Sequence, residues 1–164
     1  MKVLVISAAY PPMHAGEATN TYHLCRKLAE HGIDVHVLTS ISNVGTNDPR
    51  IRVHSIMQTW GWFELIRIRS FLKSCAPDAV FLMYIGLMYN FHPMVTFLPT
   101  LCKSLFQNVS FVTRYESAFV GADPSKTSLL SRLFRKLMVL WSGTTDVAYS
   151  SGTLLRDSDA IIAL

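Results

Sequence analysis

The sequence is poor in charge and lacks the basic patterns of nucleic-acid-binding proteins. Only 16% of its 164 residues are charged, against about a quarter in an average globular domain. Such a composition fits either a well-covered core or a surface that another domain or a membrane masks. No basic run is interleaved with aromatic residues, and the net charge of +4 is mild. We therefore expect no nucleic-acid partner.

Cysteine is scarce, and neither metal-binding nor export patterns are present. Cys25, Cys75 and Cys102 form no C-x-x-C pair and are odd in number, so we expect reduced, buried thiols in a cytosolic protein. The first residues lack the charged, apolar and cleavage regions of a signal peptide. No histidines have a spacing such as H-E-x-x-H, so no metal and no cofactor is assigned.

One stretch without formal charge, Ala79–Cys102, is long enough to raise the question of a transmembrane helix. Asn90, Pro93 and Pro99 interrupt it. A buried strand followed by a helix that starts near Pro93 explains the stretch better than a membrane span does.

Apolar runs and amphipathic segments alternate along the chain. Short apolar runs predict strands over residues 2–7, 34–39, 51–56, 79–84, 109–113 and 159–164. Helical patterns fall between them, over residues 16–31, 64–75, from 93, 125–141 and from 153. This alternation predicts an α/β fold, a Rossmann-like, doubly wound parallel sheet of about six strands in a single domain over residues 1–164.

The turn between the first strand and the first helix, AAYPPMHAGEATN (residues 8–20), is the candidate ligand-binding loop. It contains neither G-x-G-x-x-G nor G-x-x-x-x-G-K-[ST], so a dinucleotide fingerprint and a P-loop are both excluded. Gly16 nevertheless lies where a helix begins, and free amide groups there suit a phosphate or carboxylate. An ordinary strand-to-helix loop is the alternative.

The opening of the chain resembles the N-terminal half of a family 4 glycosyltransferase of GT-B fold. In that family an aromatic-Pro-Pro element follows the first strand, then a Gly-Gly pair, then a helix that ends in an L-x-x-x-G-H-x-V-x-V-x-T pattern. The matching pieces here are Tyr10-Pro11-Pro12, Ala15-Gly16 and the run from Leu28 to Thr39. Ala15 replaces the first glycine, which is possible only where that residue does not need a positive φ.

The resemblance implies a retaining enzyme that transfers a sugar from a nucleotide-diphosphate sugar to an acceptor hydroxyl, on a lipid-linked acceptor or a cell-surface polysaccharide. It implies donor-phosphate binding at Gly16 and Ala15 and acceptor binding at Tyr10. The family's second, donor-binding half carries an acidic E-x-x-x-x-x-x-x-E motif that these residues lack. We therefore expect an acceptor-side half, inactive alone, whose partners are the C-terminal donor-binding domain, the sugar nucleotide and an acceptor glycan or glycolipid.

Parallel α/β sheets bind ligands beyond the carboxyl ends of their strands. This rule predicts one rim made from residues 10–16, 84–90 and 114–117, with His14, Tyr84 and Tyr115 as further acceptor-binding candidates. At the end of the fifth strand the family often has a histidine that contacts the donor sugar, and Arg114-Tyr115-Glu116 fills that position here. We take both charged residues as catalytic candidates. Arg114 could bind an acidic acceptor or a donor phosphate, and Glu116 could accept a hydroxyl proton. Alternatively these two side chains simply pair with each other.

Two segments combine apolar and basic residues. The predicted helix over residues 125–141 has a broad apolar face and carries Arg132, Arg135 and Lys136, and a second patch places Trp60 and Trp62 near Arg67 and Arg69. Either segment fits contact with an anionic membrane, which would make the protein cytoplasmic and peripheral at the inner face of the cell membrane. A helix packed on the sheet with a solvated basic face is the alternative.

A different class of function also fits the same pattern of strands and helices. A non-catalytic binding or regulatory domain with a flavodoxin-like or Rossmann-like sheet would need no catalytic partner half.

Overall fold

The structure is a computed structural model that describes residues 1–43, 48–116, 133, 136–137, 139–141 and 151–163. Its centre is one six-stranded sheet in which every pairing is parallel. The strands are β1 (Lys2–Ile6), β2 (Asp34–Ser40), β3 (Ile51–Met57), β4 (Ala79–Ile85), β5 (Ser110–Glu116) and β6 (Ala160–Ala163). Their order is β3-β2-β1-β4-β5-β6. The fold is the Rossmann-like α/β fold that the sequence predicts.

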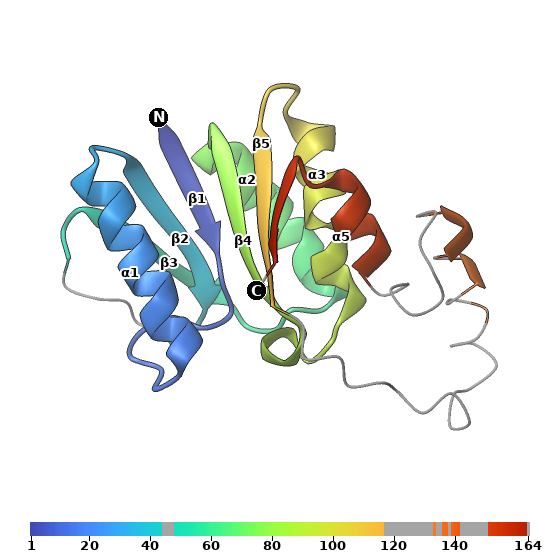
Figure 1. The fold of residues 1–164 in the computed structure, drawn as a ribbon, viewed down its shortest axis with the longest axis horizontal. Helices are drawn as coiled ribbons and strands as arrows, with labels where there is room; N and C mark the ends of the chain where they lie inside the picture. The colour runs from blue at the N-terminus through green and yellow to red at the C-terminus, as the bar shows by residue number, and fades with distance from the viewer. Residues whose placement is uncertain (44–47, 117–132, 134–135, 138, 142–150, 164) are drawn as a thin grey trace.

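Helices cover both faces of the sheet (Figure 1). Helix α1 (Gly16–Glu30) lies on one face, and α2 (Leu65–Cys75), α3 (Leu98–Leu105) and α5 (Gly152–Asp157) pack on the other. Three 3₁₀ turns complete the described elements, η1 (Trp62–Glu64), η2 (Gly86–Tyr89) and η3 (Pro93–Phe97). Residues 125–132 of the helix predicted over 125–141 lie outside the described residues, and the described positions between 133 and 141 are helical.

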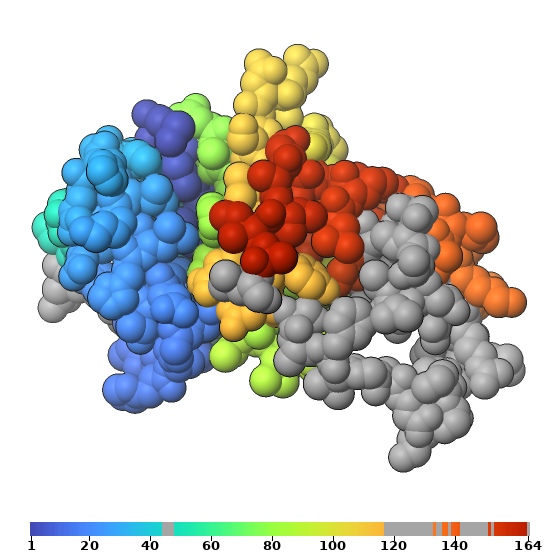
Figure 2. All heavy atoms as spheres, viewed as in Figure 1, coloured from blue at the N-terminus to red at the C-terminus, as the bar shows by residue number. Residues whose placement is uncertain are grey.

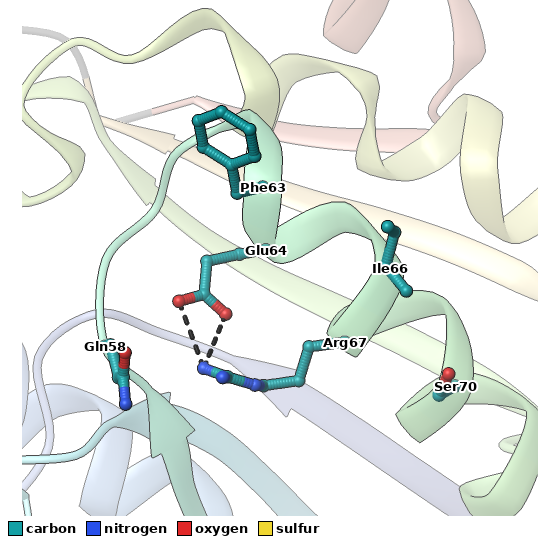
Figure 3. Close-up of a pocket in the computed structure, with 6 residues that line it drawn as sticks. All are labelled: Gln58, Phe63, Glu64, Ile66, Arg67 and Ser70. Carbon is teal, nitrogen blue, oxygen red and sulfur yellow. Dashed lines mark hydrogen bonds and ion pairs between the residues drawn. The ribbon is translucent and has the colours of Figure 1, made fainter.

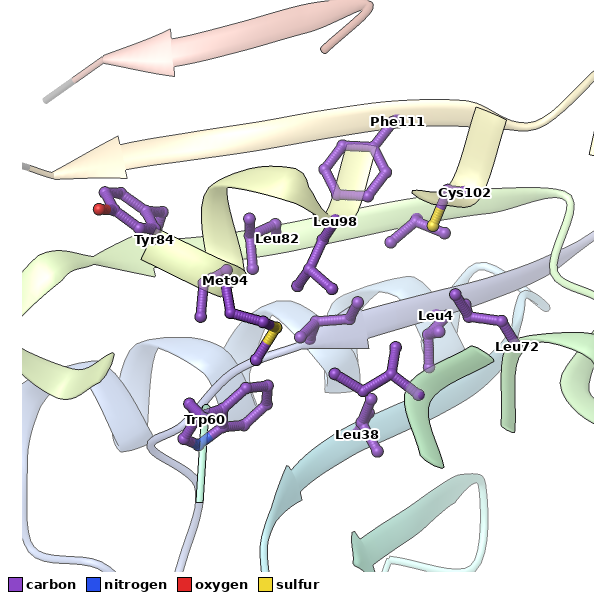
Figure 4. Packing of buried hydrophobic residues seen from close by; sticks show 14 of the residues in the cluster. Leu4, Leu38, Trp60, Leu72, Leu82, Tyr84, Met94, Leu98, Cys102 and Phe111 are labelled. Atoms are coloured by element: carbon purple, nitrogen blue, oxygen red, sulfur yellow. The ribbon is translucent and has the colours of Figure 1, made fainter. Parts of the chain in front are cut away.

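Each face of the sheet has its own apolar core. The larger core packs side chains of β1, β2, β4 and β5, among them Leu4, Leu38, Leu82 and Phe111, against Leu72, Met94, Leu98 and Cys102 (Figure 4). The smaller core lies under α1 and contains Val5, Val37, Cys25 and Tyr10. Because both faces are covered, β1 is a continuous apolar run rather than an alternating one, and the middle of β2 is buried on both faces.

The uncharged stretch from Ala79 forms β4, η2, η3 and α3, as the interruptions at Asn90, Pro93 and Pro99 predict. In the described part of the chain no helix is long and apolar enough to cross a membrane. The three cysteines are free and buried, which confirms that part of the prediction. Burial raises the pKa of the Cys25 and Cys102 thiols to about 12.

Two predicted details need correction. Strand β5 does not end at Thr113 but runs to Glu116, because Arg114, Tyr115 and Glu116 continue the pairing with Met83, Tyr84 and Ile85 of β4. Trp60 is not part of a surface patch either. Its side chain is buried, its indole Nε1–H donates to Ser40 Oγ at 3.0 Å, and its ring packs edge-on against Tyr89 with centroids 4.9 Å apart.

Candidate functional site

The carboxyl ends of β1, β4 and β5 meet at the lower edge of the sheet in Figure 1. The loop after β1, the turn η2 after β4 and the last residues of β5 converge there, as the sequence predicts for a rim. This arrangement brings together segments that are far apart in the chain.

Hydrogen bonds from neighbouring segments fix the start of the loop at Ala8. Its N–H donates to the Tyr89 hydroxyl at 3.2 Å, and its carbonyl oxygen accepts from Ser40 Oγ at 3.1 Å and Asn43 Nδ2 at 3.0 Å. The Tyr89 hydroxyl in turn donates to the Met83 carbonyl at 2.9 Å. The loop therefore leaves β1 in a direction set by the ends of β2 and β4.

Gly16 is the first residue of α1 and is exposed. A Cβ built on Gly16 meets no atom within 4 Å, and the residue has no positive φ. Neither local packing nor backbone conformation therefore requires a glycine here. Ala15, at the N-cap position, has φ −142° and ψ 146°, an extended conformation that alanine adopts without strain. The replacement of the family's first glycine by Ala15 is thus tolerated.

Three amide groups at the start of α1 lack acceptors in the described part of the chain, although only Gly16 of the three residues is exposed. Ala15 provides no side-chain cap, and the first helical hydrogen bond runs from the Thr19 N–H to the Ala15 carbonyl at 3.2 Å. The N–H groups of Gly16, Glu17 and Ala18 have no acceptor among the residues that the structure describes. Three free donors and the positive end of a helix dipole favour an anion at this point.

An ion cluster joins the start of α1 to the end of β5. The Arg114 guanidinium lies 3.7 Å from Glu17 Oε1 and 3.4 Å from Glu116 Oε2. Glu17 is buried and Glu116 is half-exposed. Burial raises the pKa of the Glu17 carboxyl, Arg114 lowers it and Glu116 raises it again, and the net shift is upward. The pairing of Arg114 with Glu116 that we considered as an alternative is present, and Glu17 joins it.

The aromatic candidates on the rim form a stack. The ring of Tyr84 lies between those of Tyr89, at 5.9 Å, and Tyr115, at 5.5 Å, and both pairs are nearly parallel. Tyr84 is buried, which raises the pKa of its hydroxyl. Tyr115 is only partly buried and shares a 3.0 Å hydrogen bond with Ser151 Oγ. Of the two, Tyr115 is the one that solvent reaches.

The two remaining acceptor candidates have different surroundings. Tyr10 is fully buried in the smaller core and packs edge-on against Tyr22, with ring centroids 6.4 Å apart. In this structure Tyr10 therefore lies beneath the rim rather than on it. His14 is exposed on the loop, two residues before Gly16.

A separate shallow pocket of about 590 Å³ lies on the outer side of η1 and α2 (Figure 3). It is lined by Gln58, Phe63, Glu64, Ile66, Arg67 and Ser70. Its polar pair is Glu64 with Arg67, at 2.8 Å. Among the described residues no group of three histidine, cysteine, aspartate or glutamate side chains could hold a metal ion.

Two residues that shape the site were not among the sequence-predicted candidates. Nothing in the sequence pattern shows that β5 brings Arg114 next to Glu17. Tyr89 lies in a short segment whose 3₁₀ geometry gives no periodic signal.

A family model agrees with the resemblance of the opening segment. Residues 13–113 match the model of a family described as glycosyl transferase 4-like. Among solved structures, the UDP-glucose 4-epimerase of Thermotoga maritima with UDP-glucose is similar at 16% sequence identity and a TM-score of 0.45. The match covers 70% of this chain and only 37% of that chain. No curated protein matches the sequence.

Proposed function

We propose, from the premise that this chain belongs to the glycosyl transferase 4-like family, that it forms the acceptor-binding half of a retaining glycosyltransferase. The reaction would transfer a sugar, a hexose, from a nucleotide-diphosphate sugar to an acceptor hydroxyl. A donor-binding lobe outside these residues would hold the nucleotide, so this half alone would not turn over substrate. No further cofactor is needed for this chemistry.

The observation that carries the proposal is the open start of α1. Gly16 is exposed without a packing reason, and the amide groups of Gly16, Glu17 and Ala18 are free of acceptors among the described residues. Negative charge grows on the diphosphate as the sugar leaves, and preorganised N–H donors stabilise that charge. A side chain at Gly16 would occupy the space that the diphosphate needs.

The ion cluster would serve the acceptor rather than the diphosphate. Arg114 faces two carboxylates, so the cluster has a formal charge of about −1 and attracts hydroxyl donors more than anions. Glu116 is the more exposed carboxylate, and it would accept the hydrogen bond of the attacking hydroxyl. Arg114, which is itself paired with the buried Glu17, would hold Glu116 in place. The accessible edge of Tyr115, with His14 across the rim, would complete the acceptor contacts.

The acceptor class follows from the same proposal. A lipid-linked sugar or a growing cell-surface polysaccharide presents hydroxyls at a membrane, so the protein would work in the cytoplasm at the inner face of the cell membrane. Tyr84 and Tyr10, which are buried, would then support the rim from below.

The test is donor consumption by the full-length protein with membrane lipids as acceptors. Release of UDP, GDP or ADP from the corresponding sugar nucleotides identifies the donor. The variant Glu116→Gln should lower the rate about 10²-fold, the effect of losing a positioned proton acceptor. Glu30→Gln, at the far end of α1, is the matched control and should leave the rate unchanged. Consumption of no donor, or equal rates for Glu116→Gln and the unmodified protein, would contradict the proposal.

A further inference from the structure

The turn that follows β4 holds a large aromatic residue in a backbone conformation that such residues rarely adopt. Asn90 and Phe91 have φ values of 51° and 52°, in the left-handed region. Asparagine tolerates this region, but a residue with a bulky side chain is an outlier there. Outliers of this kind persist where the surrounding structure holds them, and they gather at ligand-binding sites. Phe91 is therefore a candidate ligand contact.

Two hydrogen bonds and a glycine hold Phe91 in this conformation. Its N–H donates to the Gly86 carbonyl at 2.7 Å, and the Asn90 N–H donates to the Leu87 carbonyl at 3.0 Å. This pair of bonds closes η2 in the pattern of a Schellman motif. The phenyl ring lies against Gly86, where a built Cβ would come within 2.8 Å of Phe91 Cδ1. Any side chain at position 86 would displace the ring, so the turn fixes the position of the ring.

Burial in the core does not explain this conformation. Phe91 is 52% exposed and Leu87 is 66% exposed, whereas Tyr89 and Met94 of the same segment fill the larger core. An asparagine or a glycine at position 91 would adopt the same backbone with less strain. The fold therefore gains little from a phenylalanine here. Two exposed apolar side chains in one short turn of the rim indicate a contact with a ligand.

The phenyl ring lies next to the candidate site. Ile85 pairs in register with Glu116 at the end of β5, and Gly86 is the next residue. The Cβ built on Gly86 also lies 3.8 Å from the Tyr84 hydroxyl, and Tyr84 stacks on Tyr115. In Figure 2 the yellow-green atoms of the turn lie at the lower edge of the molecule, directly below the yellow-orange end of β5. The ring and the end of β5 therefore belong to the same rim.

We infer that Phe91 and Leu87 form an apolar platform for an uncharged pyranose ring of the acceptor. This inference rests on the proposed function and names the chemical class of its acceptor. The C–H groups on one face of the sugar lie on the phenyl ring, and a hydroxyl at the sugar's edge reaches Glu116. Because the turn holds the phenyl ring in place before the sugar arrives, binding orders few side chains.

The charges around the platform select a neutral sugar over two other ligands. The ion cluster of Glu17, Arg114 and Glu116 has a formal charge of about −1, so it would repel a carboxylate or phosphate on the acceptor ring. No residue from Ala79 to Cys102 carries a formal charge that would offset this repulsion. An alkyl chain would cover Leu87 and the phenyl ring but would gain nothing from the Glu116 carboxylate. A neutral sugar uses both.

The test is an NMR titration of the ¹⁵N-labelled full chain with methyl β-D-glucopyranoside. We expect the amide signals of Leu87, Asn90 and Phe91 to shift progressively, with a dissociation constant of about 1–10 mM for a single sugar ring. Methyl β-D-glucuronide, which has the same ring with a carboxylate, should bind at least about fivefold more weakly. Hexanol, which combines an alkyl chain with a hydroxyl, should leave these signals in place.

The variant Phe91→Asn separates a ligand contact from a structural role. Asparagine tolerates the left-handed conformation, so this variant should unfold at the temperature of the unmodified chain or above it. It should nevertheless bind the glucoside at least about tenfold more weakly, because the aromatic face is gone. Phe91→Tyr keeps the ring and should retain binding. Phe63→Asn is the matched control, because it removes a 97% exposed phenylalanine of η1 and should bind the glucoside like the unmodified chain.

Four results would overturn the inference. The first is the absence of shifts at positions 86–91 with about 50 mM glucoside. The second is equal binding by Phe91→Asn and the unmodified chain. The third is binding of the glucuronide or of hexanol as tight as that of the glucoside. The fourth is a lower unfolding temperature for Phe91→Asn, since the fold would then need the ring.

These outcomes are distinct from a failure of the proposed function. If the glucoside does not bind while the full-length protein still consumes a sugar nucleotide, the inference fails and the proposed function stands. Glucoside binding that depends on Phe91 in a protein that consumes no donor would contradict the proposed function instead.

Discussion

The carboxylate of Glu17 lies 3.7 Å from the guanidinium of Arg114, and this contact connects the first turn of α1 to the last residues of β5. Glu17 is buried, and burial raises the pKa of its carboxyl more than the neighbouring arginine lowers it. The protein therefore keeps an acid where its ionised form is destabilised. Sites that bind ligands commonly retain such groups at the expense of stability.

Glu17→Gln should stabilise the fold at neutral pH by about 0.5–1 kcal/mol, because it removes a poorly solvated charge. A folded-state pKa above the ordinary value of 4.5 means that the protonated form stabilises the native state. That contribution is complete below pH 4.5 and is lost as the pH rises through the folded-state pKa. Urea unfolding of both proteins between pH 4 and 7 should therefore diverge with rising pH.

Arg114→Met provides the contrast, because it leaves the Glu17 carboxylate without its cation. We expect the free energy of unfolding to fall by about 1–3 kcal/mol at pH 7. Combining this change with Glu17→Gln should restore part of that stability. A destabilised Glu17→Gln, or additive effects in the double variant, would argue that the two side chains are not coupled.

Tyr89→Phe should lower the free energy of unfolding by about 1–3 kcal/mol. The fully buried hydroxyl accepts a hydrogen bond from the Ala8 N–H and donates one to the Met83 carbonyl. The same change at Tyr115, whose hydroxyl shares one bond with Ser151 Oγ and is partly buried, should cost less than about 1 kcal/mol. Urea midpoints at pH 7 measure both. Equal costs would mean that Tyr89 does not fix the loop after β1.

The paired side chains of His36 and His54 should make the fold less stable in mild acid. Their rings stack at 5.2 Å and share a 3.0 Å hydrogen bond, which needs one neutral acceptor nitrogen. Burial lowers the pKa of both histidines from 6.5, although Asp34 partly opposes this for His36. Their stabilising contribution is present above pH 6.5 and is lost as the pH falls through the lowered values.

Unfolding at pH 7.5 and pH 5.5 checks the histidine prediction. The unmodified chain should lose about 1 kcal/mol between the two conditions. The double variant His36→Leu with His54→Phe, which cannot titrate at these positions, should lose less than half as much. A drop of the same size in the double variant would assign the acid sensitivity to other groups.

The sequence predicts the sheet well because strands covered on both faces leave an unbroken apolar signature. Six strands and their parallel pairing were predicted from such runs and from their alternation with helices. The predicted end of β5 at Thr113 was wrong. Arg114 and Glu116 are charged, and charged residues after an apolar run usually indicate that a buried strand has ended. Pairing with β4 outweighs that local preference.

The site could be predicted only as a set of loops. The rule for parallel sheets selects the loop after β1, the turn after β4 and the end of β5, and the structure places them on one edge. The rule does not say which side chains come into contact. Glu17 and Arg114 are neighbours because the first turn of α1 packs next to the end of β5, and this packing is not visible in the sequence. Trp60 was predicted to lie on the surface but is buried. An aromatic residue near arginines in the sequence is equally consistent with a surface patch and with the core.

Our central proposal is that position 16 is a glycine because a bound ligand needs the space beside it, and not because the fold requires a glycine there. A titration of the ¹⁵N-labelled chain with UDP, followed by amide NMR, tests it most directly. We predict that the amide signals of Gly16, Glu17 and Ala18 shift progressively. Gly16→Val, whose Cβ would meet no atom within 4 Å, should abolish these shifts, with thermal unfolding as the check that the variant is folded. Signals at these three positions that stay fixed at millimolar UDP, or shifts that persist in Gly16→Val, would contradict the account.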